Sequence, residues 1–223
     1  MIALLDSAPY LFRALLTTFW LGGVAVVGSL VVGTLLALCR LSPIAPLRAV
    51  ATAYVFVMRT IPLLDVIFWL FFALPLFFGR NMPPLVAAAT ALVFYESSYM
   101  AEVIRSGIQA VPKGVVDAAR SQGMSAWQRA RHITLPLAFH AMQPALLTQY
   151  KAAIMGTSIV YVVGVRDFFG AANDVNNRIF QPFLIFALVA AVYFLICFSI
   201  TVLARAVNRR LNGGSWAIAS VDA

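Results

Sequence analysis

The sequence predicts an all-α polytopic membrane protein with five transmembrane helices, formed by one transmembrane domain over residues 1–223. The chain is 62% hydrophobic and only 11% charged, with a mean hydropathy of +0.91, whereas soluble domains carry about 25% charged residues. It also contains five mostly apolar stretches of about 20 residues, the length that a helix needs to cross the hydrocarbon core. Most basic residues stand between these stretches, so the pattern excludes a single soluble core.

Uncharged stretches predict the first and the last helix. The first lies between Arg13 and Arg40, a distance that allows a helix to cross with some tilt. The last is bounded by Pro182 and Arg205 and contains no charged residue. In chain order, the predicted spans cover about residues 14–39, 54–78, 84–104, 137–163 and 183–204.

The three middle spans contain ionisable residues. Arg59 and Asp65 lie in the second, Glu96 and Glu102 in the third, and Lys151 in the fourth. Because a charge at the bilayer centre costs about 2.5–3.5 kcal/mol on insertion scales, these side chains should face protein or a water-filled path. Arg59 would then pair with Glu96 or Asp65. Lys151 has no acid within helical reach, so its partner must be another span, a second subunit or a transported anion.

The positions of the basic residues predict the orientation. Five crossings place the two termini on opposite sides, and cytoplasmic loops carry an excess of Lys and Arg. With the N-terminus outside, ten of the sixteen basic residues lie on the cytoplasmic side and four lie outside. The ten are Arg40, Arg48, Arg105, Lys113, Arg120, Arg129, Arg131, Arg205, Arg209 and Arg210. We therefore expect an external N-terminus and a cytoplasmic C-terminus.

Several other classes of function have no support in the residues. The formal net charge of +8 does not indicate a nucleic-acid partner, because the arginines stand at the ends of apolar runs rather than on a soluble face. Cys39 and Cys197 lie inside apolar runs without metal-ligand spacing, and His132 and His140 lack a third ligand. We expect no metal site, no catalytic residues and no cofactor in this chain.

The longest polar segment, residues 105–136, is cytoplasmic in this topology. Its sequence predicts a short helix, a break at Gly123 and a second, amphipathic stretch that carries Trp127 and Ile133 and ends at Pro136. An ordinary solvated loop is the alternative interpretation. A compact pair of helices with apolar anchors and a charged rim would instead dock into a groove of a soluble partner.

The spacing within this segment resembles the cytoplasmic EAA signature of ABC-importer permeases. The signature consists of E-A-A, three residues, Gly, nine residues and I-x-L-P. The run Asp117–Ala119, Gly123 and the run Ile133–Pro136 occupy its fixed positions. The one departure is Asp117, an acid of the same sign that is one methylene shorter than Glu.

Three further runs resemble polar amino acid permeases of the same importer class. They are SYMAEVIRSGIQ at 98–109, MRTIPL at 58–63 and GTSIV at 156–160. The resemblance extends over most of the chain, from about residue 15 to residue 210. The short length and the SPIAP run after the first span are most similar to the smaller membrane subunit of glutamate/aspartate importers.

This resemblance implies the transmembrane domain of a type I ABC importer in a bacterial inner membrane, with a periplasmic N-terminus. It implies two ATPase subunits, a second permease subunit that is similar but non-identical or else a second copy, and a periplasmic amino acid-binding protein. The chain has no G-x-x-x-x-G-K-[ST] loop, so ATP and Mg would bind to the ATPase and this chain would not be an enzyme. The residues expected to couple to the ATPase are Asp117, Ala118, Ala119, Gly123, Met124, Ile133, Leu135 and Pro136.

Intramembrane charge favours an acidic amino acid, glutamate or aspartate, as the substrate. Where relatives often place a carboxylate before Thr-Ser, this chain has Gly156, which argues against cationic substrates. Arg59 and Lys151 could compensate an anionic side chain. Glutamine, asparagine or another polar amino acid is the alternative. The expected substrate pathway consists of Arg59, Thr60, Glu96, Gln149, Lys151, Gly156, Thr157 and Ser158.

Two other classes of membrane protein, enzymes and secondary transporters, would show different sequence patterns. A membrane-embedded enzyme would bring a pair of acids onto one helix face, but Glu96 and Glu102 are about 120° apart in helical register. An ion-coupled secondary transporter usually consists of two repeated halves, and the sequence shows no internal duplication. Gly156 could also simply kink its helix, and Thr157 and Ser158 could bond back to helix carbonyls.

Overall fold

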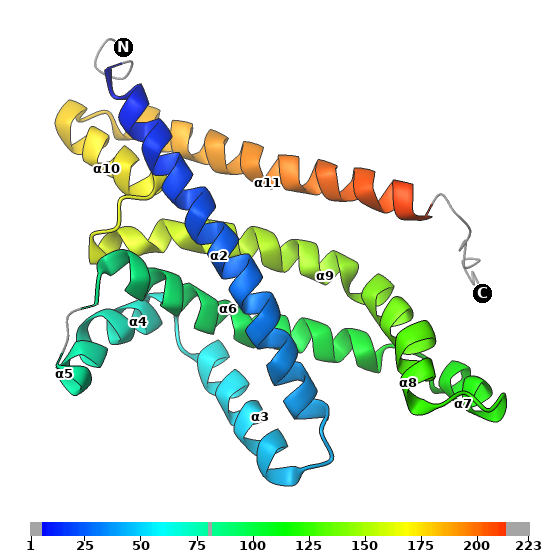
Figure 1. Ribbon diagram of the computed structural model, residues 1–223. Coiled ribbons are helices and arrows are strands. Elements are labelled where there is room, and N and C mark those ends of the chain that lie inside the picture. Colours follow the sequence, from blue (N-terminus) through cyan, green and yellow to red (C-terminus); the bar gives the residue numbers. More distant parts are fainter. Residues whose placement is uncertain (1–5, 80–81, 213–223) are drawn as a thin grey trace.

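The structure is a computed structural model that describes residues 6–79 and 82–212, and every regular element in this part of the chain is a helix (Figure 1). The first half contains α2 (Ala8–Leu41), α3 (Ala45–Thr60), α4 (Leu63–Phe68), the π-helix η1 (Trp69–Ala73), α5 (Leu74–Phe78) and α6 (Pro84–Gln109). The second half contains α7 (Lys113–Ser121), α8 (Ala126–Arg129), the π-helix η2 (Ala130–Thr134), α9 (Leu135–Gly156), the 3₁₀-helix η3 (Thr157–Val163), α10 (Phe168–Ile179) and α11 (Pro182–Asn212).

Helices α2 and α6 pack closely against each other, and α9 packs against both. In Figure 1, α2 crosses α6 and α9, while α7 and α8 lie at the end of the bundle where α6 ends and α9 begins. The face of α2 that is buried carries small residues, which let two helix backbones approach closely where apolar surroundings provide no hydrophobic drive. These buried residues are Ala14, Thr18, Gly22, Ala25, Ser29, Gly33 and Ala37.

The segment predicted as a second span is not one straight helix. Helix α3 ends at Thr60, and Ile61 is extended, with φ −90° and ψ 136°. The cause is Pro62, whose ring disfavours a helical conformation of the preceding residue. Helix α4 then begins at Leu63, and the two helical arms on either side of the break are bent by 108°. This segment is therefore a broken span or a re-entrant loop.

By length and apolar composition, three helices within the described residues can cross a membrane, or four if the bent pair counts as one span. The three are α2, the continuous helical stretch Ala126–Val163, and α11 over Pro182–Ala206. Helix α6 has 26 residues, which is long enough, but polar residues such as Glu96 lower its hydropathy. The predicted helical fold is confirmed, and five crossings stay a prediction. The C-terminus lies beyond the described residues.

A buried polar cap fixes α10 against α2 and α11. Asp167 accepts a hydrogen bond from the Gly170 amide at 2.9 Å and another from the Tyr193 hydroxyl at 3.1 Å. The Phe168 amide donates to the Thr18 hydroxyl oxygen at 2.9 Å. Burial raises the pKa of the Asp167 carboxyl, although its hydrogen bonds favour the charged form. This cap therefore joins three helices around one acid.

Candidate functional site

The polar segment contains the predicted short helix, α7, a break at Gly123 and a second helical stretch, α8, which continues through η2 into α9 (Figure 1). In α7, Asp117 and Ala118 are exposed, whereas Ala119 is only 6% exposed. Helix α8 presents Trp127, which is 68% exposed. An acid, a small residue and an exposed aromatic side chain on a compact helical pair form a surface that a soluble partner could bind.

Gly123 makes the turn between the two helices. Its φ is +82°, in the left-handed region that a residue with Cβ rarely adopts. The Gly123 amide donates to the Arg120 carbonyl at 3.0 Å, and the Met124 amide donates to the Ala119 carbonyl at 3.2 Å. These two bonds close the Schellman motif that ends a helix with glycine at the C′ position. The glycine of the signature thus has a local structural reason.

Local features of the backbone define the N-terminus of α8 and the junction between α8 and α9. Ser125 and Gln128 form a reciprocal capping box at the N-terminus of α8. Beyond α8 the helix widens into η2, in which the Leu135 amide donates to the Ala130 carbonyl. Pro136 follows directly and has no amide to donate, which is a recognised cause of such local helix distortion. Leu135 and Pro136 are exposed.

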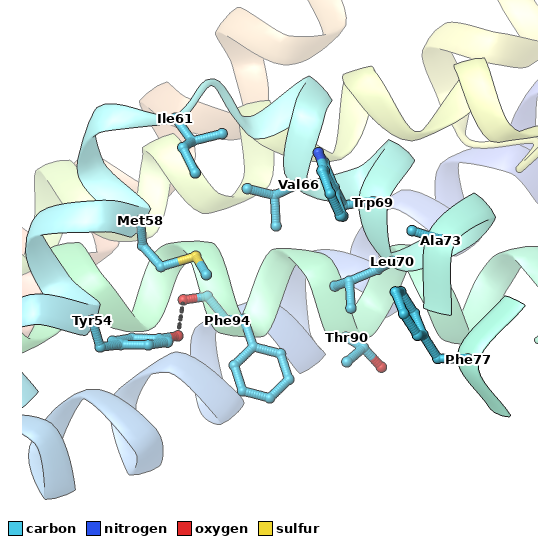
Figure 2. A pocket seen from close by; sticks show the side chains of 10 residues that line it. All are labelled: Tyr54, Met58, Ile61, Val66, Trp69, Leu70, Ala73, Phe77, Thr90 and Phe94. Atoms are coloured by element: carbon cyan, nitrogen blue, oxygen red, sulfur yellow. Dashed lines mark hydrogen bonds between the residues drawn. The ribbon is translucent and has the colours of Figure 1, made fainter. Parts of the chain in front are cut away.

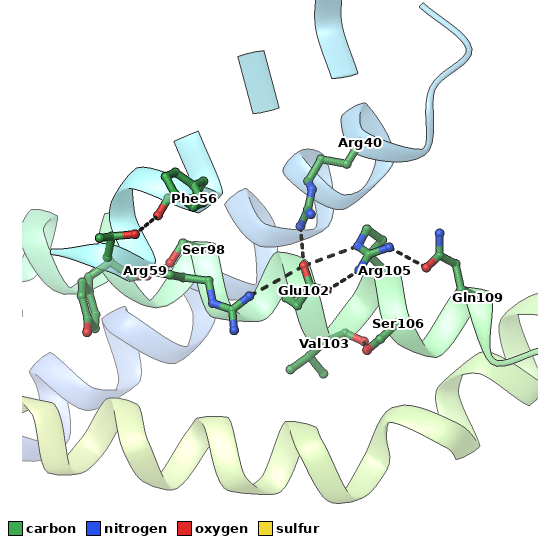
Figure 3. A network of polar contacts seen from close by, with 11 residues as sticks. Arg40, Phe56, Arg59, Ser98, Glu102, Val103, Arg105, Ser106 and Gln109 are labelled. Carbon is green, nitrogen blue, oxygen red and sulfur yellow. Dashed lines mark hydrogen bonds and ion pairs between the residues drawn. The ribbon is translucent and has the colours of Figure 1, made fainter. Parts of the chain in front are cut away.

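A cluster of arginines surrounds Glu102 near the same end of the bundle (Figure 3). Arg40, at the end of α2, donates to the Glu102 carboxylate at 2.6 Å. Arg59 on α3 lies 3.9 Å from the same carboxylate oxygen, and its guanidinium lies 5.2 Å from the centre of the Tyr99 ring. Arg105 pairs with Glu102 within α6.

The observed ion-pair partner of Arg59 differs from the predicted partners. The predicted partners of Arg59 were Glu96 and Asp65, but the carboxylate within ion-pair distance is that of Glu102. Sequence reasoning placed Glu102 in its span without giving it a role. The available signal was the Glu102–Arg105 spacing of three residues, which brings two side chains together on a helix. Nothing in the sequence indicated Arg40 as a further partner.

The structure brings Glu96, Gln149 and Gly156 together between α6 and α9. Glu96 is 3% exposed and accepts a hydrogen bond from the Gln149 amide. A Cβ atom added to Gly156 would lie 3.6 Å from Glu96 Oε1 and 3.3 Å from a Leu63 methyl group. Gly156 thus leaves room beside the buried carboxylate.

Of the other predicted pathway residues, Arg59 and Thr60 line one cavity, and Lys151, Thr157 and Ser158 are not among its walls. Lys151 is half-buried, and among the described residues it makes no hydrogen bond or ion pair. Thr157 donates back to the Ile154 carbonyl at 2.8 Å, and Ser158 donates back to the Met155 carbonyl at 2.7 Å. These two hydroxyls thus adopt the back-bonded arrangement that the sequence left open.

A cavity of about 630 Å³ lies between α3, α4, η1 and α6 (Figure 2). Its walls are mostly apolar side chains, among them Met58, Val66 and Leu70. The Tyr54 hydroxyl on its wall is already engaged, because it donates to the Phe94 carbonyl at 2.8 Å. None of the predicted pathway residues lines this cavity. Its chemistry does not suit a charged amino acid.

No three His, Cys, Asp or Glu side chains within residues 6–79 and 82–212 come together as ligands of a metal ion. The polar groups described above offer hydrogen bonds and charge.

Residues 29–213 match the family described as the binding-protein-dependent transport system inner membrane component. The match covers well over half of the chain, and the chain belongs to this family. It is therefore an ABC importer permease, a membrane subunit that works with a separate ATPase and a partner permease. The resemblance inferred from the EAA signature is confirmed.

Curated relatives are similar over nearly their whole length. The glutamate/aspartate import permease protein GltK of Escherichia coli O6:H1 (strain CFT073) is 37% identical over 215 residues, which are 93% of this chain and 96% of the relative. The probable glutamine ABC transporter permease protein GlnP of Bacillus subtilis (strain 168) is 31% identical over 208 residues, 92% of this chain and 95% of the relative.

Solved structures have the same fold. One is the crystal structure of an amino acid ABC transporter with histidines, which matches with a TM-score of 0.86 and 31% identity over 94% of this chain and 97% of that chain. An inward-facing MetNI methionine ABC transporter matches with a TM-score of 0.67 at 23% identity, over 93% of this chain and 97% of that chain, and shows the fold alone.

Proposed function

We propose that this permease imports acidic amino acids, glutamate or aspartate, from the periplasm to the cytoplasm by alternating access. The observation that carries the choice of substrate is Lys151, a half-buried cation with no ion-pair partner among the described residues. The likeness to a glutamate/aspartate permease supports the same choice. An anionic substrate side chain in the path would supply a negative charge to pair with Lys151.

Coupling to ATP hydrolysis is assigned to the α7–α8 pair. Asp117, Ala118 and Trp127 are exposed there, and Gly123 holds the two helices in a fixed turn. Two ATPase subunits, which bind ATP and Mg, would dock on this pair and on its counterpart in a second, similar but non-identical permease. A periplasmic binding protein would deliver the amino acid at the opposite face.

The proposed topology has five crossings, with α6 and the bent α3–α5 segment as two of them. The N-terminus is periplasmic and the C-terminus is cytoplasmic. This assignment places α7, α8 and ten basic residues on the cytoplasmic side, as the positive-inside rule requires.

Uptake by a Lys151→Met variant tests the substrate assignment. The complete importer is reconstituted in liposomes, and uptake of radiolabelled aspartate is compared for the wild type, Lys151→Met and the charge-preserving Lys151→Arg. Loss of one charge-assisted contact should lower aspartate uptake by about tenfold or more, with Lys151→Arg close to the wild type. Normal aspartate uptake by a stable Lys151→Met importer would contradict the proposal.

A structural role of Lys151 predicts a different result. Removal of the lysine would then leave a buried acid unpaired and destabilise the assembly. The candidates were Glu96 and Asp65; Glu96 accepts a hydrogen bond from Gln149, and neither acid is within ion-pair distance of Lys151 in the described part of the chain. A Lys151→Met importer that assembles normally but loses aspartate uptake therefore supports the substrate role.

Glutamine is the second candidate, because a relative with 31% identity is a probable glutamine permease. Uptake of glutamine and of aspartate by the wild-type importer distinguishes the two. Equal losses of both substrates in Lys151→Met would count against recognition of substrate charge.

A further inference from the structure

A second cavity, of about 330 Å³, lies beside the arginine cluster. It is formed by side chains of α2, α3 and α6, and Arg40, Arg59, Thr60 and Tyr99 are among its walls. Cavities that hold small molecules span about 300–1,000 Å³. In contrast to the apolar cavity of Figure 2, this one offers two guanidinium groups and hydroxyl groups to a ligand.

The charges around this cavity do not balance. Three arginines lie within 4.0 Å of one carboxylate, that of Glu102 (Figure 3). Arg105 uses both carboxylate oxygens of Glu102 and also donates to Gln109 at 2.5 Å. One acid on α6 therefore neutralises only one of the three cations, and positive charge is left on the two arginines that line the cavity.

The two cavity arginines also keep unused hydrogen-bonding capacity. Arg40 Nε is buried and has no hydrogen-bond partner. Arg59 is 3.9 Å from the Glu102 carboxylate, a long distance for a direct hydrogen bond, and its side chain is 43% exposed. Guanidinium groups bind carboxylates in a planar, two-pronged geometry, so both arginines could accept a further anion.

We propose that this cavity is an anion site at the inner end of the permease, which takes the side-chain carboxylate of an acidic amino acid. The proposal rests on the proposed function, and it names a binding site beyond Lys151. Glu102 is the resident carboxylate of the site. It holds Arg40 and Arg59 in place when no ligand is bound, and Arg105 keeps it on α6 when a ligand carboxylate takes its place.

This arrangement makes Glu102 a competitor of the ligand. Arg105 belongs to the same helix as Glu102, so their pair survives when the cross-helix contacts to Arg40 and Arg59 open. The anionic headgroup of a lipid would offer similar chemistry to the two arginines. The cavity size suits a free amino acid, and the experiment separates the two sources.

Equilibrium binding of radiolabelled L-aspartate tests the site. The complete importer, with its ATPase and partner permease, is placed in nanodiscs of neutral phosphatidylcholine without the binding protein. Arg59→Gln should weaken aspartate binding by about tenfold. The matched control is Arg48→Gln on the same helix, because exposed Arg48 donates to the Ser42 carbonyl and does not line the cavity; this variant should bind aspartate like the wild type.

The Glu102→Gln variant gives a readout of opposite sign. Removal of the resident carboxylate should strengthen aspartate binding severalfold, because the competitor is lost. A cluster that serves only to hold the helices together predicts weaker assembly and no gain in binding. Unchanged binding in Arg59→Gln, or no gain in a Glu102→Gln importer that assembles normally, would overturn the proposal.

Aspartate binding in nanodiscs that contain phosphatidylglycerol tests whether a lipid headgroup occupies the site. If that lipid blocks aspartate binding in the wild type and the block is lost in Arg59→Gln, the site belongs to the headgroup and the proposal is wrong. The proposed function is tested separately by wild-type uptake. An importer that takes up aspartate normally while Arg59→Gln has no effect refutes this site alone.

Discussion

Replacing Gly123 by alanine is expected to loosen the α7–α8 turn without any steric clash. The φ of +82° costs a residue with Cβ about 1–2 kcal/mol. A Cβ atom at Gly123 would meet no heavy atom within 4 Å, so the cost comes from the backbone alone. Alanine also lowers the conformational entropy of the unfolded chain, and this offsets about 0.4–1 kcal/mol of the cost. The net loss is at most about 1.6 kcal/mol, or a factor of up to about 15 in the opening equilibrium.

Hydrogen exchange measures this opening directly. The amides of Gly123 and Met124 donate to Arg120 and Ala119 in the wild type, and a peptide over residues 113–129 reports on them. In the complete importer, Gly123→Ala should exchange faster in this peptide by about that factor. Gly123→Asn should remain close to the wild type, because asparagine tolerates the left-handed conformation. The ATPase subunit should also be retained less well during purification of Gly123→Ala.

Gly114→Ala provides the matched control. Gly114 lies in α7 on the same loop, and a Cβ atom added to it would likewise meet no heavy atom within 4 Å, but its φ is not positive. Alanine there should stabilise the helix by up to about 1 kcal/mol. Equal exchange rates in Gly123→Ala and Gly114→Ala would show that the positive φ does not control the turn.

Three further predictions concern the loop, the topology and the α10 cap. Asp117→Lys should abolish coupled uptake while membrane insertion stays normal, because it reverses an exposed charge on the docking surface and changes no span; normal uptake would refute the coupling role. A reporter fused after Arg210 should be accessible only from the cytoplasm, and periplasmic accessibility would overturn the topology. Asp167→Ala should lose about 0.5–2 kcal/mol of stability with the N-cap, whereas Asp167→Asn keeps the cap. Burial raises the pKa of Asp167, so the ionised wild type loses stability as pH rises; melting temperatures at several pH values should show Asp167→Asn gaining on the wild type at higher pH.

The turn and the helical stretches of the polar segment 105–136 could be predicted from the sequence because their signals are local. Gly123 and Pro136 each act on the backbone within a few residues of their own position, and the capping box of Ser125 and Gln128 is a further local signal that the sequence analysis did not use. The structure places a Schellman turn, a capping box and a helix distortion at these residues. A regular spacing in the chain was therefore enough to locate both helices.

The bend in the predicted second span was missed for a different reason. Its hydropathy continues across Ile61 and Pro62, so a count of apolar residues does not register the break. Pro62 was recognised only as part of a motif. The rule that the residue before proline avoids the helical conformation would have predicted the end of α3 at Thr60, but not the 108° bend, which depends on packing against α6.

The Glu102 cluster shows the limit of reading charges along one helix. Arg40 and Glu102 are far apart in sequence, and their pairing follows from the close approach of α2 and α6. That approach depends on a face of small residues on α2, which was predicted only as an apolar stretch. Small residues in a membrane helix should therefore be examined as packing faces before charges are paired.

Under the proposed topology, the described charges follow an order that suits an anion moving inward. Glu96 is held by Gln149 in the middle of the bundle, where no arginine lies within ion-pair distance of it among the described residues. Cations without full partners occur at Lys151 on α9 and at Arg40 and Arg59 near the inner end. Under the two proposals, a substrate carboxylate would meet Lys151 first and the arginine pair next. Each site then needs only moderate affinity, because a path that releases its substrate requires several weak contacts rather than one tight one.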